Sequence, residues 1–160
     1  MYNVTLIPGD GIGPEVANAT KAVVDATGIQ INWEEVNAGE AVYEKVGTLV
    51  PDEVYDTIKK NRLALKGPIT TPIGKGFRSI NVMLRTKYDL YSNVRPSRNF
   101  KGIDTPFNNV NMTIFRENTE GLYIGEEKVV DNNTTEATKR ITRSGSLRIC
   151  REAFEYAKKL

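Results

Sequence analysis

The sequence contains no histidine and only one cysteine, Cys150. Without histidine, the chain cannot form a histidine-ligated zinc site or a catalytic dyad or triad that relies on an imidazole base. A single cysteine excludes an internal disulfide framework, which favours reducing, cytoplasmic surroundings. Proton transfer by this chain must therefore use tyrosine, lysine, aspartate or glutamate.

Long apolar runs and a strong charge imbalance are also missing. No stretch approaches the roughly 20 apolar residues of a membrane span, and the N-terminus MYNVTLIPGDGIG lacks the basic and apolar regions of a signal peptide. The net charge is +2, so composition gives no general case for nucleic acid or a membrane as partner. We expect a protein that is neither secreted nor membrane-bound, in which any positive field is local.

Short apolar strands alternate with helical patterns through the first part of the chain. Proline, glycine and acidic residues mark where strands end and helices begin. The expected strands cover residues 3–7, 29–36 and 62–66. Three helices are expected: one that begins at Pro14, one over residues 40–46 and one over residues 52–61. This alternation predicts an α/β fold with a parallel sheet covered on both faces, and ligands near the carboxyl ends of the strands.

The loop after the first strand matches a dinucleotide-binding turn only in part. Its glycines are Gly9, Gly11 and Gly13, and Pro14 stands where the G-x-G-x-x-G fingerprint requires its third glycine. Acidic residues do lie about 20 positions further on, where the fingerprint has its ribose-binding acid. Because the missing glycine allows close helix–strand packing, a Rossmann site is the less favoured interpretation.

Residues 66–98 carry a dense set of potential anion-binding groups. The stretch KGPITTPIGKGFRSINVMLRTKYDLYSNVRPSR predicts a loop and a helix that Ser79 caps and that runs to about Lys87. A strand over residues 89–94 is expected to bring Arg95 to its end. Glycines at 67, 74 and 76 are expected to let a ligand approach the backbone closely.

Helical spacing places Asn81 and Arg85 one turn apart on the same side of that helix. A guanidinium is always charged, and its flat fork of donors matches a carboxylate. These side chains predict a site for a polycarboxylate or a phosphate. Composition alone equally allows a solvated arginine face without a ligand.

A second domain is expected to follow the polar segment 99–109. A strand over residues 110–116 leads into a polar loop that carries Arg116 and Tyr123. Residues 127–131 and 135–142 alternate as two strands of a ribbon, an arm of the kind that often pairs with a partner chain.

The last predicted helix runs from Ser144 to Leu160. Leu147, Cys150 and Phe154 fall on one face of it, which favours a buried thiol in the core over a reactive nucleophile.

Five segments in order resemble the isocitrate dehydrogenase branch of the metal-dependent decarboxylating 2-hydroxyacid dehydrogenases, a family that includes isopropylmalate, homoisocitrate and tartrate dehydrogenases. They are IPGDGIGPEV, KGPITTPIGKGFRSINVMLR, DLYSNVRP, FRENTEGLYIGEE and RSGSLRICREAFEYAKKL. The resemblance implies an isopropylmalate dehydrogenase-like fold that is not Rossmann. Residues 1–98 would form the first part of an incomplete large α/β domain, and residues 99–160 the start of a smaller α/β domain with the ribbon arm.

The resemblance also implies roles for single residues. Ser79, Asn81, Arg85, Arg95 and Arg116 would bind the carboxylates of isocitrate. Thr70 and Thr71 would contact the nicotinamide side of the cofactor, Lys66 would help to hold the anion, and Tyr123 would give a proton to the enolate left after decarboxylation. Isopropylmalate enzymes have apolar leucines where this helix has a serine and an asparagine, so a third carboxylate on the substrate is favoured.

The implied reaction is oxidation of the 2-hydroxyl of isocitrate with NAD or NADP, followed by decarboxylation to 2-oxoglutarate with Mg²⁺ or Mn²⁺ as Lewis acid. In the family the metal-binding aspartates, a catalytic lysine and most of the cofactor site lie in later sequence than residue 160. The resemblance therefore implies no metal ligand within this chain, and the chain alone is expected to be inactive.

Family members are roughly twice this long, which leaves several interpretations open. The first interpretation is a fragment or truncated product of an isocitrate dehydrogenase. The second is a chain that pairs as a homodimer or with a complementing chain. The third is a noncatalytic binding or regulatory module. Homoisocitrate or isopropylmalate dehydrogenase is the alternative activity.

Overall fold

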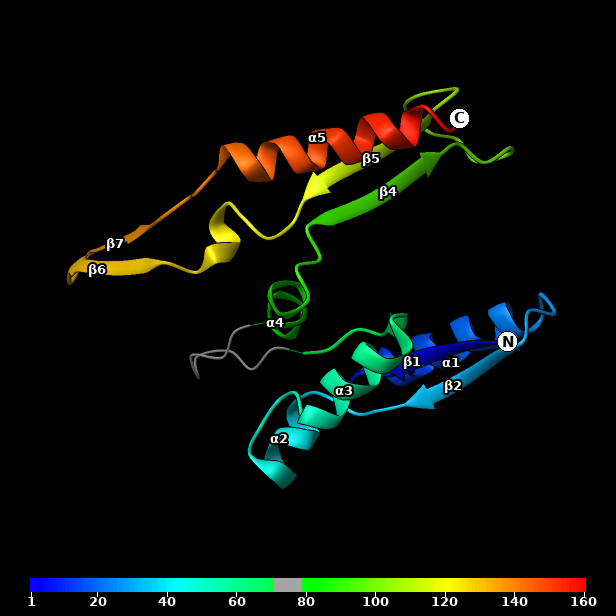
Figure 1. Ribbon diagram of the computed structural model, residues 1–160, viewed down its shortest axis with the longest axis horizontal. Helices are drawn as coiled ribbons and strands as arrows, with labels where there is room; N and C mark the ends of the chain where they lie inside the picture. Colours follow the sequence, from blue (N-terminus) through cyan, green and yellow to red (C-terminus); the bar gives the residue numbers. More distant parts are fainter. Residues whose placement is uncertain (71–78) are drawn as a thin grey trace. The chain divides into compact units, whose positions relative to one another are not determined.

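The computed structural model describes residues 1–70 and 79–160 (Figure 1). The chain forms two compact units, Met1–Ile80 and Asn81–Leu160. The sequence-based division after Arg98 concerns parts of a large and a small domain in longer family members, and it stays a prediction.

The first unit is built around a three-stranded parallel sheet with the strand order β2-β1-β3. Its elements are β1 (Tyr2–Ile7), α1 (Gly13–Asp25), β2 (Ile31–Glu35), α2 (Glu40–Val46), α3 (Asp52–Asn61) and β3 (Ala64–Lys66). The parallel sheet confirms the prediction from strand–helix alternation. The two short helices have the predicted bounds, because Pro51 and the acidic residues after it start α3 and a glycine ends α2.

The carboxyl half of β1 forms the core of this unit. Val4, Thr5, Leu6 and Ile7 are all buried, although successive side chains of a strand point to opposite faces. Both faces of the sheet are therefore covered at this point. In Figure 1, α3 passes in front of β1 and α1 behind it, and the Asn61 amide at the end of α3 donates to the Thr5 hydroxyl over 3.1 Å.

The loops that follow β1 and β3 meet at the carboxyl edge of the sheet, as the sequence predicted. The amide of Asp10 donates to the carbonyl of Pro68 over 3.2 Å. A methyl group on Gly67 would lie 2.1 Å from the carbonyl oxygen of Pro8. The glycine at 67 thus allows contact between the two loops, whereas the sequence interpretation had assigned it to ligand approach. The glycines at 74 and 76 lie outside the described residues.

The Asp10 carboxylate ties these loops together. Its Oδ1 accepts from the amide of Thr70 over 2.6 Å, and its Oδ2 accepts from the amide of Glu40 over 3.4 Å, at the start of α2. One side chain therefore sets the position of the loop that reaches Thr70.

The second unit contains an antiparallel pair of strands, a two-stranded ribbon and a long helix. Its elements are α4 (Ile80–Lys87, whose first residue ends the first unit), β4 (Ser92–Arg98), β5 (Asn111–Glu117), the 3₁₀ helix Leu122–Ile124, β6 (Glu127–Asp131), β7 (Thr134–Ala137) and α5 (Arg143–Ala157). The prediction for β4 was wrong in its bounds, because a turn around Asp89 delays the strand and Pro96 lies within it. Arg95 is consequently inside the strand and not at its end.

The pairing of β4 with β5 gives this sheet two chemically different faces. Asn93 lies opposite Arg116, and Ser92 lies opposite Glu117. Because side chains alternate along a strand, Arg95 and Arg116 share one face, and Phe115 and Glu117 share the other. In Figure 1, α5 runs along β5, and the rings of Tyr156 and Phe115 pack 5.2 Å apart. The helix therefore covers the Phe115 and Glu117 face.

The prediction that Cys150 is a core thiol was wrong. Cys150 is exposed, as are Leu147 and Phe154 on the same side of α5. The helix instead turns Arg148 and Tyr156 toward β5. An ion pair and an aromatic contact, rather than the helix's most apolar stripe, thus set its rotation.

The ribbon β6–β7 projects away from the β4–β5 pair in Figure 1, and all its residues are exposed. It confirms the predicted arm, although β7 ends at Ala137, earlier than expected. Within the described ranges, no helix is long and apolar enough to cross a membrane.

Candidate functional site

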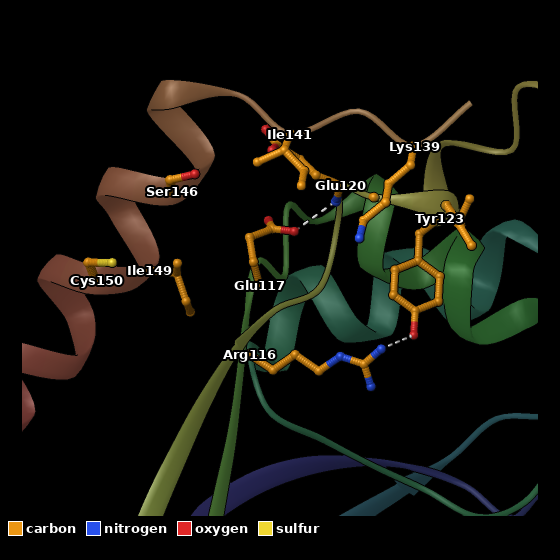
Figure 2. A pocket seen from close by; sticks show the side chains of 11 residues that line it. Arg116, Glu117, Glu120, Tyr123, Lys139, Ile141, Ser146, Ile149 and Cys150 are labelled. Carbon is orange, nitrogen blue, oxygen red and sulfur yellow. Dashed lines mark hydrogen bonds between the residues drawn. The ribbon is translucent and has the colours of Figure 1, made fainter. Parts of the chain in front are cut away.

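Arg116 and Tyr123 form the centre of the candidate site (Figure 2). Arg116 is near the end of β5, and Tyr123 lies in the 3₁₀ helix that follows the loop. The Arg116 Nη2 donates to the Tyr123 phenol oxygen over 2.6 Å. Because the phenol oxygen is the acceptor in this bond, its O–H hydrogen can donate to a different group.

Arg85 of α4 approaches the same tyrosine. Its Cζ atom lies 5.9 Å from the centre of the Tyr123 ring, and the Cζ atom of Arg116 lies 5.5 Å from it. Both distances are within the range of cation–π attraction. Asn81 lies one turn before Arg85 in α4, so helix geometry places it on the same side, as predicted.

Arg95 reaches the site through the register of the sheet. Arg116 is opposite Asn93, and Arg95 lies two residues beyond Asn93 in β4. Arg95 and Arg116 are therefore diagonal neighbours on the same face of β4–β5. The Nε of Arg95 donates to the Asn93 side-chain oxygen over 3.1 Å. The second unit thus brings together Tyr123 and three predicted arginines. Two of the arginines, Arg85 and Arg116, lie over the ring of Tyr123.

None of these three arginines has a carboxylate partner among the described residues. Arg140 and Arg148 in the same unit, by contrast, do form ion pairs. Like charges held around one phenol repel each other, and an anion between them removes that cost. The arrangement suits a ligand with several carboxylates, which guanidinium groups can both neutralise and orient.

The remaining predicted residues belong to the first unit or lie outside the described residues. Thr70 is exposed, and its amide is held by Asp10. The Lys66 Nζ donates to the carbonyl of Gly67 over 2.6 Å. Ser79 is half-buried just before α4, and Thr71 lies outside the described residues. The roles predicted for these four residues stay predictions.

A cavity of about 610 Å³ opens beside Arg116 and Tyr123 in the second unit. Figure 2 shows Lys139 and Ile141 on one side of it, and Ser146, Ile149 and Cys150 of α5 on the other. No group of three or more acidic or cysteine side chains that could hold a metal ion occurs in residues 1–70 and 79–160. The expectation that the metal ligands lie in later sequence than residue 160 stays a prediction.

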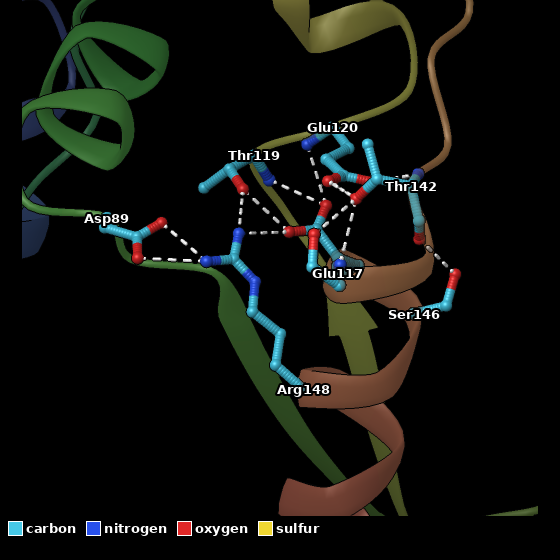
Figure 3. Close-up of polar contacts among 9 residues, drawn as sticks. Asp89, Glu117, Thr119, Glu120, Thr142, Ser146 and Arg148 are labelled. Atoms are coloured by element: carbon cyan, nitrogen blue, oxygen red, sulfur yellow. Dashed lines mark hydrogen bonds and ion pairs between the residues drawn. The ribbon is translucent and has the colours of Figure 1, made fainter.

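The loop between Arg116 and Tyr123 is held by a carboxylate that sequence reasoning did not assign (Figure 3). The Glu117 Oε2 accepts from the amide of Thr119 over 2.9 Å and from the amide of Glu120 over 2.7 Å, and its Oε1 accepts from the Thr119 hydroxyl. Arg148 donates to Oε1 over 3.0 Å. The only sequence signal was the polar run RENTEG, in which an acid next to the site arginine can cap the turn.

A second carboxylate joins the loop to the start of α5. Glu120 accepts hydrogen bonds from the hydroxyl and the amide of Thr142, and the Thr142 hydroxyl in turn caps the helix by accepting from the amide of Gly145 over 3.0 Å. A methyl group on Gly145 would lie 2.5 Å from the Glu120 carboxylate. The buried glycine at 145 therefore makes room for Glu120.

The pKa values of both glutamates are lowered. Burial raises the pKa of Glu117, but hydrogen bonds from Thr119, two backbone amides and Arg148 outweigh it and bring the pKa below its ordinary value of 4.5. The pKa of Glu120 is lowered by hydrogen bonds from the side chain and amide of Thr142. Each carboxylate is more acidic in the folded chain, so each contributes stability that is fully present above pH 4.5.

We expect the free energy of unfolding of the second unit to fall as the pH drops below about 4.5. Protonation of Glu117 and Glu120 removes the acceptors that hold the loop and the start of α5. Urea unfolding at a series of pH values, followed by circular dichroism, measures this dependence. The Glu117→Gln and Glu120→Gln variants should each show a weaker pH dependence than the parent, and equal slopes would contradict the assignment.

The family model described as isocitrate/isopropylmalate dehydrogenase matches residues 3–160. The chain is similar to subunit 2 of the mitochondrial NAD isocitrate dehydrogenase of Kluyveromyces lactis, with 44% identity over 98% of this chain and 42% of that protein. It is also similar to the chloroplastic 3-isopropylmalate dehydrogenase of Solanum tuberosum, with 42% identity over 99% of this chain and 44% of that protein.

The structure resembles the crystal structure of isocitrate dehydrogenase from Methylococcus capsulatus, with a TM-score of 0.91 and 49% identity over 99% of this chain and 48% of that one. This chain thus spans less than half the length of these relatives.

Proposed function

The chain belongs to the isocitrate/isopropylmalate dehydrogenase family, and from that premise we propose that its second unit carries the tricarboxylate-binding part of an isocitrate dehydrogenase. The proposed reaction of the whole protein is NAD- or NADP-dependent oxidative decarboxylation of isocitrate. The proposal goes beyond family membership, because similar relatives include an isopropylmalate dehydrogenase.

One observation carries the proposal. Arg85, Arg95 and Arg116 converge around Tyr123 and along one sheet face without a carboxylate partner among the described residues. Isocitrate has three carboxylates, and it can satisfy three guanidinium groups through paired hydrogen bonds. A monoanionic ligand would leave much of this positive charge uncompensated.

Tyr123 is the proposed proton donor. Its phenol oxygen accepts from Arg116, so the ring is held by a charged group while the O–H hydrogen can donate to the substrate. Since the chain has no histidine, a phenol beside two guanidinium groups is the acid that these residues offer.

The cofactor and metal ion remain part of the proposal for the whole protein. A divalent cation would act as a Lewis acid on the hydroxyl and carboxylate oxygens of the substrate. Residues 1–70 and 79–160 contain no cluster for it, and we assign no step to it. A homodimer or a complementing chain, and a cytoplasmic location, are likewise proposed.

The choice between isocitrate and isopropylmalate is testable on Asn81. We expect the 160-residue chain to bind isocitrate at least about tenfold more tightly than isopropylmalate in titration calorimetry, because the amide of Asn81 can donate to a carboxylate and not to an isopropyl group. Asn81→Leu should lower the ratio of isocitrate affinity to isopropylmalate affinity by about tenfold, which would remove or reverse the preference. Asn93→Leu, on β4, is the matched amide control, which should weaken both ligands alike.

The alternative function is isopropylmalate oxidation, which the family description and the similarity to the plant enzyme support. Tighter binding of isopropylmalate by the parent chain would support it and overturn our proposal. A chain that binds isocitrate but supports no turnover with any complementing half would fit the noncatalytic module.

A further inference from the structure

The guanidinium of Arg148 is the common partner of two segments that lead to the candidate site, the link between α4 and β4 and the end of β5 with the loop that follows it. Its Nη1 donates to both carboxylate oxygens of Asp89 over 2.9 Å, and its Nη2 donates to Glu117 over 3.0 Å and to the Thr119 hydroxyl over 2.6 Å. The same group lies over the ring of Tyr91, 4.5 Å from its centre. Figure 3 shows Arg148 reaching from α5 between Asp89 and Glu117.

Each of these partners stands next to an element that carries a site residue. Asp89 follows α4, which holds Arg85, and Tyr91 directly precedes β4, which holds Arg95. Glu117 directly follows Arg116 in β5. Glu117 lies on the sheet face opposite to that of Arg95 and Arg116, so the bond from Arg148 to Glu117 approaches the sheet from behind the site.

The contact with Glu117 is the one that reaches Tyr123. Glu117 binds the amides of Thr119 and Glu120, and this turn leads into the 3₁₀ helix of Tyr123. The Glu117 side chain is 18% exposed and that of Asp89 is 67% exposed, so solvent screens the Glu117 pair less. Burial lowers the pKa of Arg148, but its hydrogen bonds to Glu117 and Asp89 raise it overall, so the group stays charged.

We propose that Arg148 is a positioning residue that holds Arg116 and Tyr123 in register with Arg85 by clamping Glu117 and Asp89. The expected effect of Arg148 on substrate binding rests on the proposed function. The clamp itself is a property of the second unit and can be tested without a ligand.

The test uses the Arg116–Tyr123 hydrogen bond as a spectroscopic readout. The 160-residue chain is produced with ¹³Cζ-tyrosine, and the Tyr123 signal is assigned by its loss in Tyr123→Phe. Arg148→Gln should move that signal to its position in Arg116→Met, while the other tyrosines, apart from Tyr91, keep theirs. A role limited to general stability would leave the Tyr123 signal in place below the melting temperature.

Arg151→Gln is the matched control, because Arg151 is exposed on the same helix and forms no ion pair within residues 1–70 and 79–160. Arg148→Lys should restore the signal only in part, since an ammonium keeps the charge but not the fork of donors. If Arg148→Gln does not fold, Glu117→Gln serves as the second variant, because it keeps the side-chain shape and weakens the same contact.

Isocitrate titrations separate this inference from the proposed function. If the parent chain binds isocitrate, Arg148→Gln should weaken binding about tenfold, and its effect should not add to that of Tyr123→Phe. If the parent does not bind isocitrate, the proposed function fails. The Tyr123 signal still tests whether Arg148 positions Arg116 and Tyr123. An unchanged Tyr123 signal in both Arg148→Gln and Glu117→Gln would overturn the inference.

Discussion

Arg116→Met is expected to weaken isocitrate binding to the 160-residue chain by about a hundredfold, equivalent to about 2.7 kcal/mol. The substitution keeps much of the apolar stem and removes the guanidinium. It also breaks the bond to the Tyr123 oxygen, so the ligand loses a charged partner and the phenol loses the group that holds it. Titration calorimetry at fixed low ionic strength measures the loss.

Arg98→Met is the matched control for this prediction. Arg98 is exposed at the end of β4, and strand alternation puts it on the face opposite to Arg95. Arg98→Met removes the same charge as Arg116→Met. A loss of isocitrate affinity caused only by the lower net charge would therefore appear in both variants. Equal affinities for Arg116→Met and the parent would contradict the proposed site.

Gly9→Ala is expected to destabilise the first unit by about 4 kcal/mol or more. Gly9 has a φ of +86°, and a methyl group there would lie 1.8 Å from the carbonyl oxygen of Pro68. A backbone oxygen cannot turn away as a side chain does, so the loops after β1 and β3 must separate. That separation also breaks the contact of Asp10 with Thr70.

Urea unfolding followed by the fluorescence of Trp33 measures this effect, because Trp33 is the single tryptophan and lies in β2. Gly28→Ala is the control, since Gly28 has a similar φ of +80° and no atom near the added methyl group. We expect it to cost only about 1–2 kcal/mol, the penalty of the left-handed backbone alone. Similar losses in the two variants would show that loop contact is not the cause.

The helices and strands were largely predictable where local chemistry decides them. The bounds of α2 and α3 follow from proline, acidic first turns and a glycine stop, all of which act within a few residues. The start of β4 was not predictable in this way. Its position depends on the left-handed turn at Asp89, whose carboxylate binds Arg148, 59 residues away in the sequence.

The burial of α5 was mispredicted for a related reason. The apolar stripe with Leu147 and Phe154 favoured a core face, but Arg148 is turned inward by the Glu117 carboxylate and Leu147 stays at the surface. Periodicity records which residues are apolar. It does not record the charged partner on another element that decides the rotation of the helix.

The sequence by itself determined the chemistry available to this protein: no imidazole, several arginines near small polar donors, and one tyrosine in a polar loop. The tertiary structure alone decided which of them meet. The register of β4 with β5 places Arg95 and Arg116 on one face, and the bond from Arg116 fixes Tyr123 beside them. These choices depend on contacts between residues far apart in the chain, whose energies no local pattern contains.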